Sequence, residues 1–422
     1  MKKYIILLVL LLFFLVISYC DCSNVENFAN YKSCSKKDGE KDGDIPDILS
    51  KVLAERDITK TEDEKNYDIY IPCSYNECEN EVLEFEGLNG KKLFLIDGCD
   101  WIASKMALWE LLKEYYNSEA SKYMPESYLL EKKDDIEKLK ENVKPDNDKI
   151  YVLKNYGQRQ EGLKLTKDLN EMVNGLSNGW YLAQEYIYNP YLIDNRKINF
   201  RYYMLVVCTN GKISAYIHSD GFLYYTPDYY DPEDGVPSDK LSFHKHITTG
   251  YIDRIVYDNN PLTLEDFRDH LDCRDYSYVN TDYSGVSTDY LKCKNLIANS
   301  SDFSLNNNWN NSDFSLRNKW NKSVETLMNK VMEAISKKIC KNTKLDGNVR
   351  FQLFGCDVAP DANLGASLME INKGPDLSAK DERDKKVKLQ VQHDIFKIID
   401  PIDSLEASTT RFVKIFESKP IQ

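Results

Sequence analysis

The chain has 422 residues, of which 42% are hydrophobic and 29% are charged, and this ordinary globular composition excludes disordered, collagen-like and multi-span membrane proteins. The 68 acidic residues outnumber the 55 basic ones, so the net charge is −13 and no nucleic-acid partner is expected. A chain of this length is expected to divide into two or three domains, because single cores stop growing near roughly 250–300 residues.

The N-terminal end predicts a targeting segment followed by a linker. Lys2 and Lys3 precede thirteen uninterrupted apolar residues, 5–17. Residues 1–20 therefore predict a signal peptide or a signal anchor helix, and hence a membrane-associated or secretory location with the side of the membrane left open. Residues 21–65 are polar and predict a solvated linker.

An N-terminal α/β domain is predicted over residues 66–125. Residues 68–72 and 92–97 have the composition of strands, and residues 104–115 carry apolar side chains at the spacing of an amphipathic helix. We expect this domain to precede the part of the chain that carries the chemistry.

A second subdomain is predicted over residues 126–190. Its first part is highly charged and predicts a helix at 134–142. Residues 150–153 and 181–187 are rich in β-branched and aromatic side chains, which favour strands.

A third subdomain is predicted over residues 191–400, and residues 401–422 are expected to form a tail. Strands are predicted at 198–208 and 213–218, and a helix at 324–340. A short motif at 301–305 recurs at 312–316, so residues from about 298 to 323 predict a surface insertion.

The sharpest chemical signal is a predicted hairpin near the C-terminus, made of residues 351–358 and 368–372. Side chains alternate along a strand, so Glu370 and Asn372 share a face that Asp357 can join. Two carboxylates and an amide oxygen suit Mg²⁺, which prefers oxygen ligands and phosphates. The alternative is a solvated strand face that carries acidic residues by chance.

A second signal follows the strand that ends at Lys154. Gly157 and Gly162 let backbone amides approach a phosphate, while Lys154 and Arg159 supply positive charge. The segment lacks the ending of a P-loop, so taken alone it also fits a surface hairpin.

A third signal is a polar stripe on a predicted buried strand. Lys197, Asn199 and Arg201 share one face, opposite Ile198 and Phe200. Buried cations need anionic partners, which phosphates or the Asp357 and Glu370 carboxylates could provide. A purely structural ion pair is the alternative.

Taken together and in this order, the motifs resemble the tubulin–tyrosine ligase-like family of ATP-grasp amino-acid ligases over roughly residues 65–400. They are Ser-Lys (104–105), Leu-Trp (108–109), Met-Pro-Glu-Ser-Tyr (124–128), Val-Leu-Lys (152–154), Gln-Glu-Tyr-Ile (184–187), Arg-Lys-Ile-Asn-Phe-Arg (196–201), His-Ile-Thr-Thr (246–249), Leu-Phe-Gly-Cys-Asp (353–357) and Glu-Ile-Asn-Lys-Gly-Pro-Asp-Leu (370–377). The resemblance implies an α+β ATP-grasp fold, in which an N-terminal α/β domain precedes two α+β subdomains that clamp ATP.

The resemblance also implies roles for individual residues. Lys154 and Arg201 would act on the phosphates during catalysis, and Mg²⁺ would be held by Asp357, Glu370 and Asn372. The residues implied to bind the nucleotide are Lys154, Arg159, Gln184, Glu185, Tyr186, Ile187, Lys197, Asn199, Arg201, His246 and Thr248. The implied activity is ATP- and Mg²⁺-dependent joining of a free amino acid to a protein acceptor through an acyl phosphate, by a monomeric enzyme.

Two departures from the family pattern leave an alternative open. Asn199 stands where the family has an aspartate, and Ser219 stands where an arginine is expected. The second hypothesis is therefore a weakly active or inactive membrane-tethered module that binds a nucleotide or acts as a scaffold.

Overall fold

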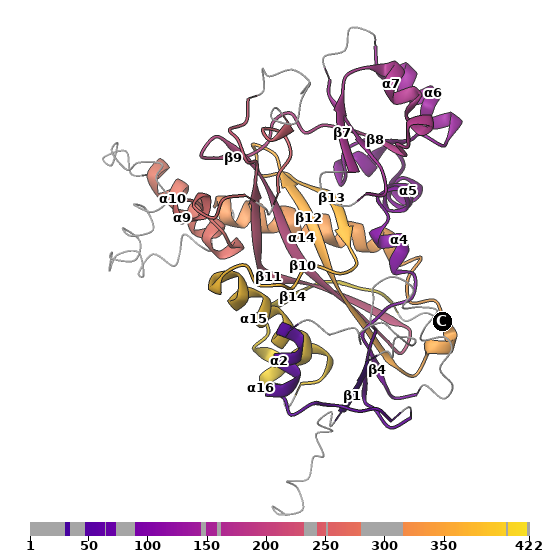
Figure 1. The fold of residues 1–422 in the computed structure, drawn as a ribbon, viewed down its shortest axis with the longest axis vertical. Helices are drawn as coiled ribbons and strands as arrows, with labels where there is room; N and C mark the ends of the chain where they lie inside the picture. Colours follow the sequence, from indigo (N-terminus) through magenta and orange to yellow (C-terminus); the bar gives the residue numbers. More distant parts are fainter. Residues whose placement is uncertain are drawn as a thin grey trace, which may run out of the picture.

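The structure is a computed structural model that describes residues 30–33, 47–63, 65–72, 89–144, 149–157, 162–231, 243–249, 252–279, 315–401 and 404–419. Two sheets organise these residues (Figure 1). The larger sheet has ten strands among the described residues, and the smaller has four. Helices cover both faces of the larger sheet and one side of the smaller.

The centre of the larger sheet is antiparallel. β10 (Arg196–Thr209) pairs with β11 (Lys212–Tyr225) on one side and with β12 (Val349–Pro360) on the other. β12 in turn pairs with β13 (Ala366–Asn372), which confirms the predicted hairpin. β14 (Phe412–Glu417) pairs with β11, so the C-terminal tail predicted over residues 401–422 contains an edge strand.

The N-terminal strands extend the same sheet in parallel. The order β12-β4-β3-β1-β2 runs from its centre to its edge. These strands are β4 (Lys92–Leu93), β3 (Ile69–Ile71), β1 (Asn30–Ser33) and β2 (Thr59–Lys60). The strand predicted at 92–97 is paired only over its first two residues, although Phe94, Leu95 and Ile96 are buried in the core.

The linker predicted over residues 21–65 is wrong for the parts that the structure describes. β1 and β2 belong to the large sheet, and helix α2 (Asp47–Glu55) packs against helix α15 (Glu382–Ile399). Leu49, Val52 and Leu53 of α2 are buried. The charged run at 36–44 made the whole region look solvated, although four apolar positions of α2 share one helical face.

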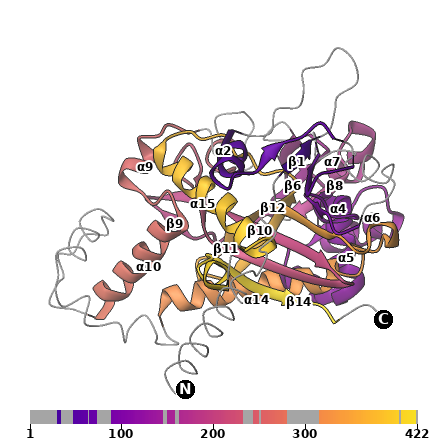
Figure 2. The same cartoon turned by 90° about the horizontal axis from the view of Figure 1, so that it is seen from below.

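Helices α14 (Leu316–Ile335) and α15 (Glu382–Ile399) lie on opposite faces of the large sheet (Figure 2). The surface insertion expected up to residue 323 is wrong from Ser315 onward, because α14 begins there and Trp320 is buried against Phe200. The first copy of the repeated motif lies outside the described residues. Smaller helical segments in this part of the chain are α9 (Val256–Asn259), α10 (Leu264–Val279), η5 (Thr343–Leu345) and α16 (Ser404–Ser408).

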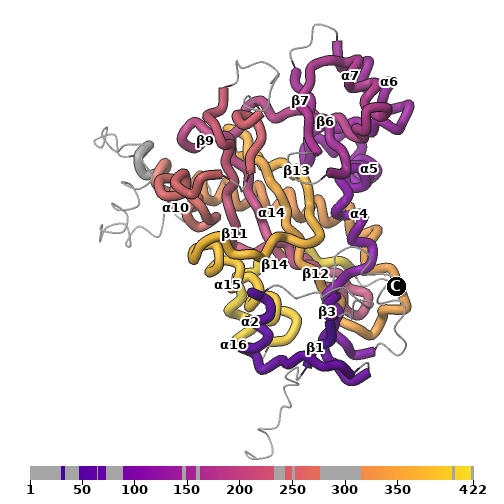
Figure 3. The backbone as a smooth tube through the Cα atoms, in the orientation of Figure 1, coloured from indigo at the N-terminus to yellow at the C-terminus, as the bar shows by residue number. Residues whose placement is uncertain are grey.

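The smaller sheet has the order β5-β8-β6-β7. Its strands are β5 (Ser127–Leu129), β8 (Leu182–Glu185), β6 (Tyr151–Lys154) and β7 (Leu163–Thr166), and its helical segments are α6 (Lys133–Asn142), α7 (Leu169–Val173) and η3 (Gly175–Asn178). Figure 3 shows this unit beside the upper end of the large sheet. A separate apolar core that includes Tyr128, Leu139, Tyr151 and Met172 stabilises it.

The two sheets are joined by α4 (Cys99–Ala103), α5 (Lys105–Tyr116) and η1 (Asn117–Lys122). Ser104 caps α5, since its side chain accepts a hydrogen bond from the amide of Ala107. Leu108, Trp109 and Leu112 face the core. The helix predicted at 104–115 is therefore confirmed.

Two further features constrain the chain. β9 (Leu192–Ile193) pairs with the start of β10, and a disulfide joins Cys208 at the end of β10 to Cys340 beyond α14. The disulfide connects residues that are 132 positions apart in the sequence.

The membrane-associated location predicted from the N-terminus is contradicted. Among the described residues, no helix is both long enough and apolar enough to cross a membrane. Residues 1–20, on which that prediction depended, lie outside the described residues.

Candidate active site

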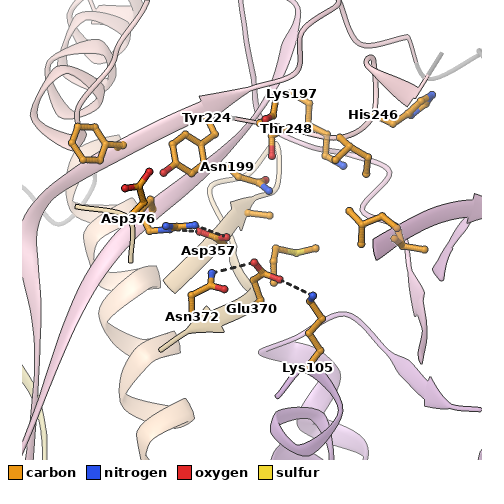
Figure 4. Close-up of a pocket in the computed structure, with 18 of the residues that line it drawn as sticks. Lys105, Lys197, Asn199, Tyr224, His246, Thr248, Asp357, Glu370, Asn372 and Asp376 are labelled. Atoms are coloured by element: carbon orange, nitrogen blue, oxygen red, sulfur yellow. Dashed lines mark hydrogen bonds and ion pairs between the residues drawn. The ribbon is translucent and has the colours of Figure 1, made fainter. Parts of the chain in front are cut away.

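A cavity of about 790 Å³ lies between the two sheets. The small sheet contributes Lys154 and Glu185, and the large sheet contributes side chains from β10, β11, β12 and β13. Figure 4 shows polar side chains of the large sheet, together with Lys105 of α5 and with His246 and Thr248, that converge on this space. A concave site between two structural units is a common place for a ligand to bind.

The strand register brings two carboxylates and an arginine together. Asp357 on β12 is paired with Glu370 on β13 and, across the other edge, with Arg201 on β10. The Arg201 Nε atom donates to Asp357 Oδ1 at 2.6 Å, and its Nη2 atom donates to Oδ2 at 3.1 Å. Such a bidentate pair fixes both groups in one plane.

Glu370 is held from two other sides. Asn372 Nδ2 donates to Glu370 Oε1 at 3.1 Å, and Lys105 Nζ lies 3.6 Å from Oε2 (Figure 4). Burial raises the pKa of Glu370, but Lys105 and Lys154 outweigh it and leave that pKa below its usual value. Burial raises the pKa of Asp357 to about 6 despite the opposing effect of Arg201. At neutral pH the site therefore holds two carboxylates.

Two lysines of the site, Lys154 and Lys197, are unusually easy to deprotonate. Burial lowers the pKa of Lys154 to about 8, although Glu370 and Asp357 favour its charged form. Burial also lowers the pKa of Lys197 to about 7. A polyanion in the cavity would stabilise the protonated form of both side chains.

The far end of the cavity has an aromatic wall. Lys197 Nζ lies 3.9 Å from the centre of the Tyr186 ring, and the Tyr186 hydroxyl is 3.0 Å from His246 Nδ1. Ile187 and Thr248 line the same end. A flat ring next to a cation suits a ligand that combines an aromatic base with negative charge.

A magnesium ion fits the donor set. Asn199 Oδ1 is buried and has no hydrogen-bond partner among the described residues, and Asp357, Glu370 and Asn372 add further oxygen atoms around the same cavity. Among the described residues, no group of three or more His, Cys, Asp or Glu side chains is arranged so that it could hold a metal ion. Two carboxylates supplemented by amide oxygens match Mg²⁺, which completes its shell with phosphates and water.

The structure brings together most of the predicted site residues. Those that line the cavity are Lys154, Glu185, Tyr186, Ile187, Lys197, Asn199, Arg201, His246, Thr248, Asp357, Glu370 and Asn372. The Gln184 side chain does not line it, because it is buried on the other face of β8 and donates to Ser127 Oγ at 2.9 Å. Arg159 lies outside the described residues.

The departure at Ser219 falls away from this cavity. Ser219 does not line the cavity, and its carbonyl accepts a hydrogen bond from Arg268 at 2.6 Å. Its amide donates to the carbonyl of Arg411. Ser219 itself therefore contributes no side chain to the cavity wall.

Sequence reasoning missed several residues of the wall. Lys105 belongs to a motif that carried the resemblance but was assigned no role, and its Nζ atom also donates to the Gly157 carbonyl at 3.3 Å. Tyr224 lines the cavity because β11 pairs it with Asn199. The alternation of side chains along β10 could have indicated Tyr224 only if the register between β10 and β11 had been known.

Comparison with known proteins gives a consistent result. The model of the family described as "Tubulin-tyrosine ligase family" matches residues 89–276 and 257–408. The chain is 26% identical to tubulin glycylase 3B of Drosophila melanogaster over 298 residues, which are 67% of this chain and 34% of that protein. It is 24% identical to a probable tubulin polyglutamylase, TTLL2, of Mus musculus over 57% of this chain and 37% of that protein. The chain thus spans only about a third of the length of these two relatives.

Proposed function

The chain belongs to the tubulin-tyrosine ligase family, and from this premise we propose that it is an ATP- and Mg²⁺-dependent ligase that joins a free amino acid to a protein. The family match confirms the predicted α+β, ATP-grasp-like fold class. We further propose that the two α+β subdomains predicted at 126–190 and 191–400 clamp the nucleotide. The small sheet and the antiparallel half of the large sheet face each other across the cavity in the way this requires.

One observation carries the proposal. Two ionised carboxylates, Asp357 and Glu370, share a cavity wall with Arg201, Lys105 and Lys154. Carboxylates that hold a metal and cations that neutralise phosphate oxygens are the parts that phosphoryl transfer requires. A purely structural ion pair would not need a cavity of about 790 Å³ beside it.

Each group has a distinct task in this proposal. Lys154 and Arg201 bind and orient the phosphates, while Tyr186 and Lys197 hold the base and ribose end. Asp357, Glu370 and Asn372 would hold Mg²⁺, which supplies charge neutralisation to the phosphates when it is bound. Asn199 adds a neutral oxygen to the same wall, so this position contributes less negative charge than an aspartate would.

The proposed reaction proceeds in two steps. A carboxylate oxygen attacks the γ-phosphorus of ATP, the bond to the β–γ bridging oxygen breaks, and ADP leaves. An amine nitrogen then attacks the carbonyl carbon of the acyl phosphate, phosphate leaves, and the amine loses a proton as the amide forms. The enzyme lowers the barrier chiefly by positioning the reactants and neutralising charge.

The partners follow from the relatives' names as expectations. A glycylase and a polyglutamylase add amino acids to tubulin, so we propose a free amino acid and a protein acceptor here, with tubulin as the first acceptor to test. We keep the expectation of a monomer that does not bind nucleic acid. The membrane-tethered form of the alternative hypothesis is set aside with the predicted location.

The test measures ATP turnover and amino-acid incorporation by the full chain with Mg²⁺, a pool of amino acids, and tubulin or peptide acceptors. Glu370→Gln should lower turnover at least about a hundredfold, because it removes one of the two carboxylates. Glu62→Gln makes the same chemical change at a side chain that is 83% exposed, and should leave turnover unchanged.

Nucleotide binding is read in the same samples from thermal stabilisation by Mg-ATP. Stabilisation without turnover across the whole panel would favour an inactive nucleotide-binding module. No stabilisation at all would refute the proposed ATP site.

A further inference from the structure

The Arg201 side chain is enclosed on more sides than its ion pair alone explains. It is 14% exposed and runs from β10 toward Asp357 across the surface of β12. A Cβ atom added to Gly355 would lie 3.1 Å from Arg201 Cδ and 3.3 Å from Nε. Glycine at this position of β12 therefore leaves room for the side chain to lie against the backbone.

The opposite side of Arg201 is covered by an aromatic ring. The guanidinium carbon lies 5.4 Å from the centre of the Tyr224 ring, within the range of a cation–π contact. Figure 4 shows Tyr224 on the same side of the cavity as Asp357, across from Lys105. Arg201 is thus held between Tyr224 and Gly355, with Asp357 at its end.

This enclosure bears on the chemistry of the site. The Asp357 pair uses Nε and Nη2 of Arg201, so the Nη1 group takes no part in that bidentate contact. An ion pair fixes the guanidinium plane only at the end that meets the carboxylate, whereas a ring on one face and a backbone on the other remove the remaining rotamers. A cation that is already oriented stabilises the developing phosphate charge without the free-energy cost of reorienting itself.

We propose that Tyr224 is a positioning residue for Arg201, whose ring keeps the guanidinium between Gly355 and Asp357 in the orientation that phosphoryl transfer needs. The effect on the reaction rate rests on the proposed ligase activity. The effect on the orientation of the Arg201 guanidinium does not depend on that activity. The ring face carries the effect, and the Tyr224 hydroxyl is not required.

The experiment compares Tyr224→Phe, which keeps the ring, with Tyr224→Leu, which removes it. In the ligation assay, Tyr224→Phe should stay within about twofold of wild type, and Tyr224→Leu should lower kcat about tenfold with a smaller change in KM for ATP. Gly355→Ala adds a methyl group beside both Arg201 and Pro375 and should also lower kcat, and thermal unfolding distinguishes a displaced Arg201 from a variant that folds poorly. Thermal unfolding of each variant is measured alongside.

A spectroscopic measurement separates this proposal from the ligase activity. The Nε–H signal of Arg201 is observed by NMR in the full chain labelled with ¹⁵N-arginine, and it is assigned by its loss in Arg201→Lys. We expect the signal to be preserved in Tyr224→Phe and to shift or broaden in Tyr224→Leu, because the ring current and the restraint are lost. This readout stands even if wild-type protein ligates nothing, an outcome that would refute the proposed function alone.

Two results would overturn the positioning role. One is a Tyr224→Leu variant with wild-type kcat and an unchanged Arg201 signal. The other is an equal loss of kcat in Tyr224→Phe and Tyr224→Leu, which would assign the effect to the hydroxyl and not to the ring.

Discussion

At the scale of single residues, we expect Lys197 to make the proposed binding of the nucleotide depend on pH. Burial lowers its pKa to about 7, and its side-chain nitrogen lies over the Tyr186 ring, with no ion pair to a carboxylate of the described residues. An anionic nucleotide binds the protonated lysine better, so protonation must accompany binding above this pKa. We expect the affinity for Mg-ATP, measured by calorimetry, to fall by up to about tenfold per pH unit above pH 7.

Lys197→Arg provides the control for this pH dependence. An arginine remains charged throughout the range, so the variant should show a flatter profile between pH 7 and pH 8.5. Burial lowers the pKa of Lys154 to about 8, so we expect this lysine to set the remaining pH dependence of the affinity at the alkaline end. An identical profile in Lys197→Arg and wild type would show that Lys197 does not govern the affinity.

Strand alternation explains why several of the predicted site residues line the cavity. Lys197, Asn199 and Arg201 alternate along β10 and all line the cavity. Gln184 belongs to a strand that was also predicted, but its side chain points to the buried face and bonds to Ser127. Alternation separates the two faces of a strand, whereas only the packing of the sheet decides which face meets the cavity.

At the scale of elements, α2 shows how a short helix can stabilise the fold from within a polar region. Val52 is fully buried and Leu53 is 1% exposed, where α2 packs on α15. Arg56 just beyond the helix donates to Glu406 at 2.8 Å and to the Asp400 carbonyl at 2.8 Å. These contacts make residues 47–56 part of the core and not a tether.

Leu53→Ala tests this assignment. Removing a fully buried leucine side chain is expected to lower the free energy of unfolding by about 2–5 kcal/mol, measured by urea denaturation of the full chain. Leu405→Ala makes the same change at a side chain that is 72% exposed and should change that free energy by less than about 0.5 kcal/mol. Equal effects of the two substitutions would return residues 47–56 to the status of a linker.

Helix α2 and the first turns of α14 were missed for the same physical reason. α2 has only nine residues, and the charged run before it dominates the local composition. α14 starts at Leu316, inside a segment rich in asparagine and before the helix predicted at 324–340, and its Trp320 lies against Phe200 and Phe267 in the core. Local composition carries no information about a packing partner that is more than fifty positions away in the sequence. Tertiary packing with such a partner can override the local preference.

At the scale of the whole molecule, the large sheet joins strands from the two ends of the chain. β1 near the N-terminus and β14 near the C-terminus lie toward opposite edges of one sheet, although the sequence suggested a separate N-terminal domain. β4 makes this connection with only two residues that pair with both β3 and β12. So short a contact carries no periodic signal, and its existence could not be predicted without the fold.

Lys105 makes two polar contacts that connect the two sheets. From the start of α5, its Nζ atom lies 3.6 Å from Glu370 on the large sheet and donates to the Gly157 carbonyl of the small-sheet unit at 3.3 Å. The Lys105 and Glu370 side chains are 20% and 29% exposed, so the pair contributes at most about 1 kcal/mol to stability. Because Lys105 lies beside the proposed phosphate site, we expect it to affect nucleotide binding more than the stability of the fold.

Lys105→Met should therefore separate binding from stability. We expect KM for ATP to rise about tenfold, because a cation that faces the phosphates is lost while the two sheets lose a common contact. The free energy of unfolding should change by less than about 1 kcal/mol. Lys51→Met, at a side chain that is 53% exposed on α2, is the matched control and should alter neither quantity. A Lys105→Met variant with unchanged KM for ATP would show that the two sheets are brought together on the nucleotide without this lysine.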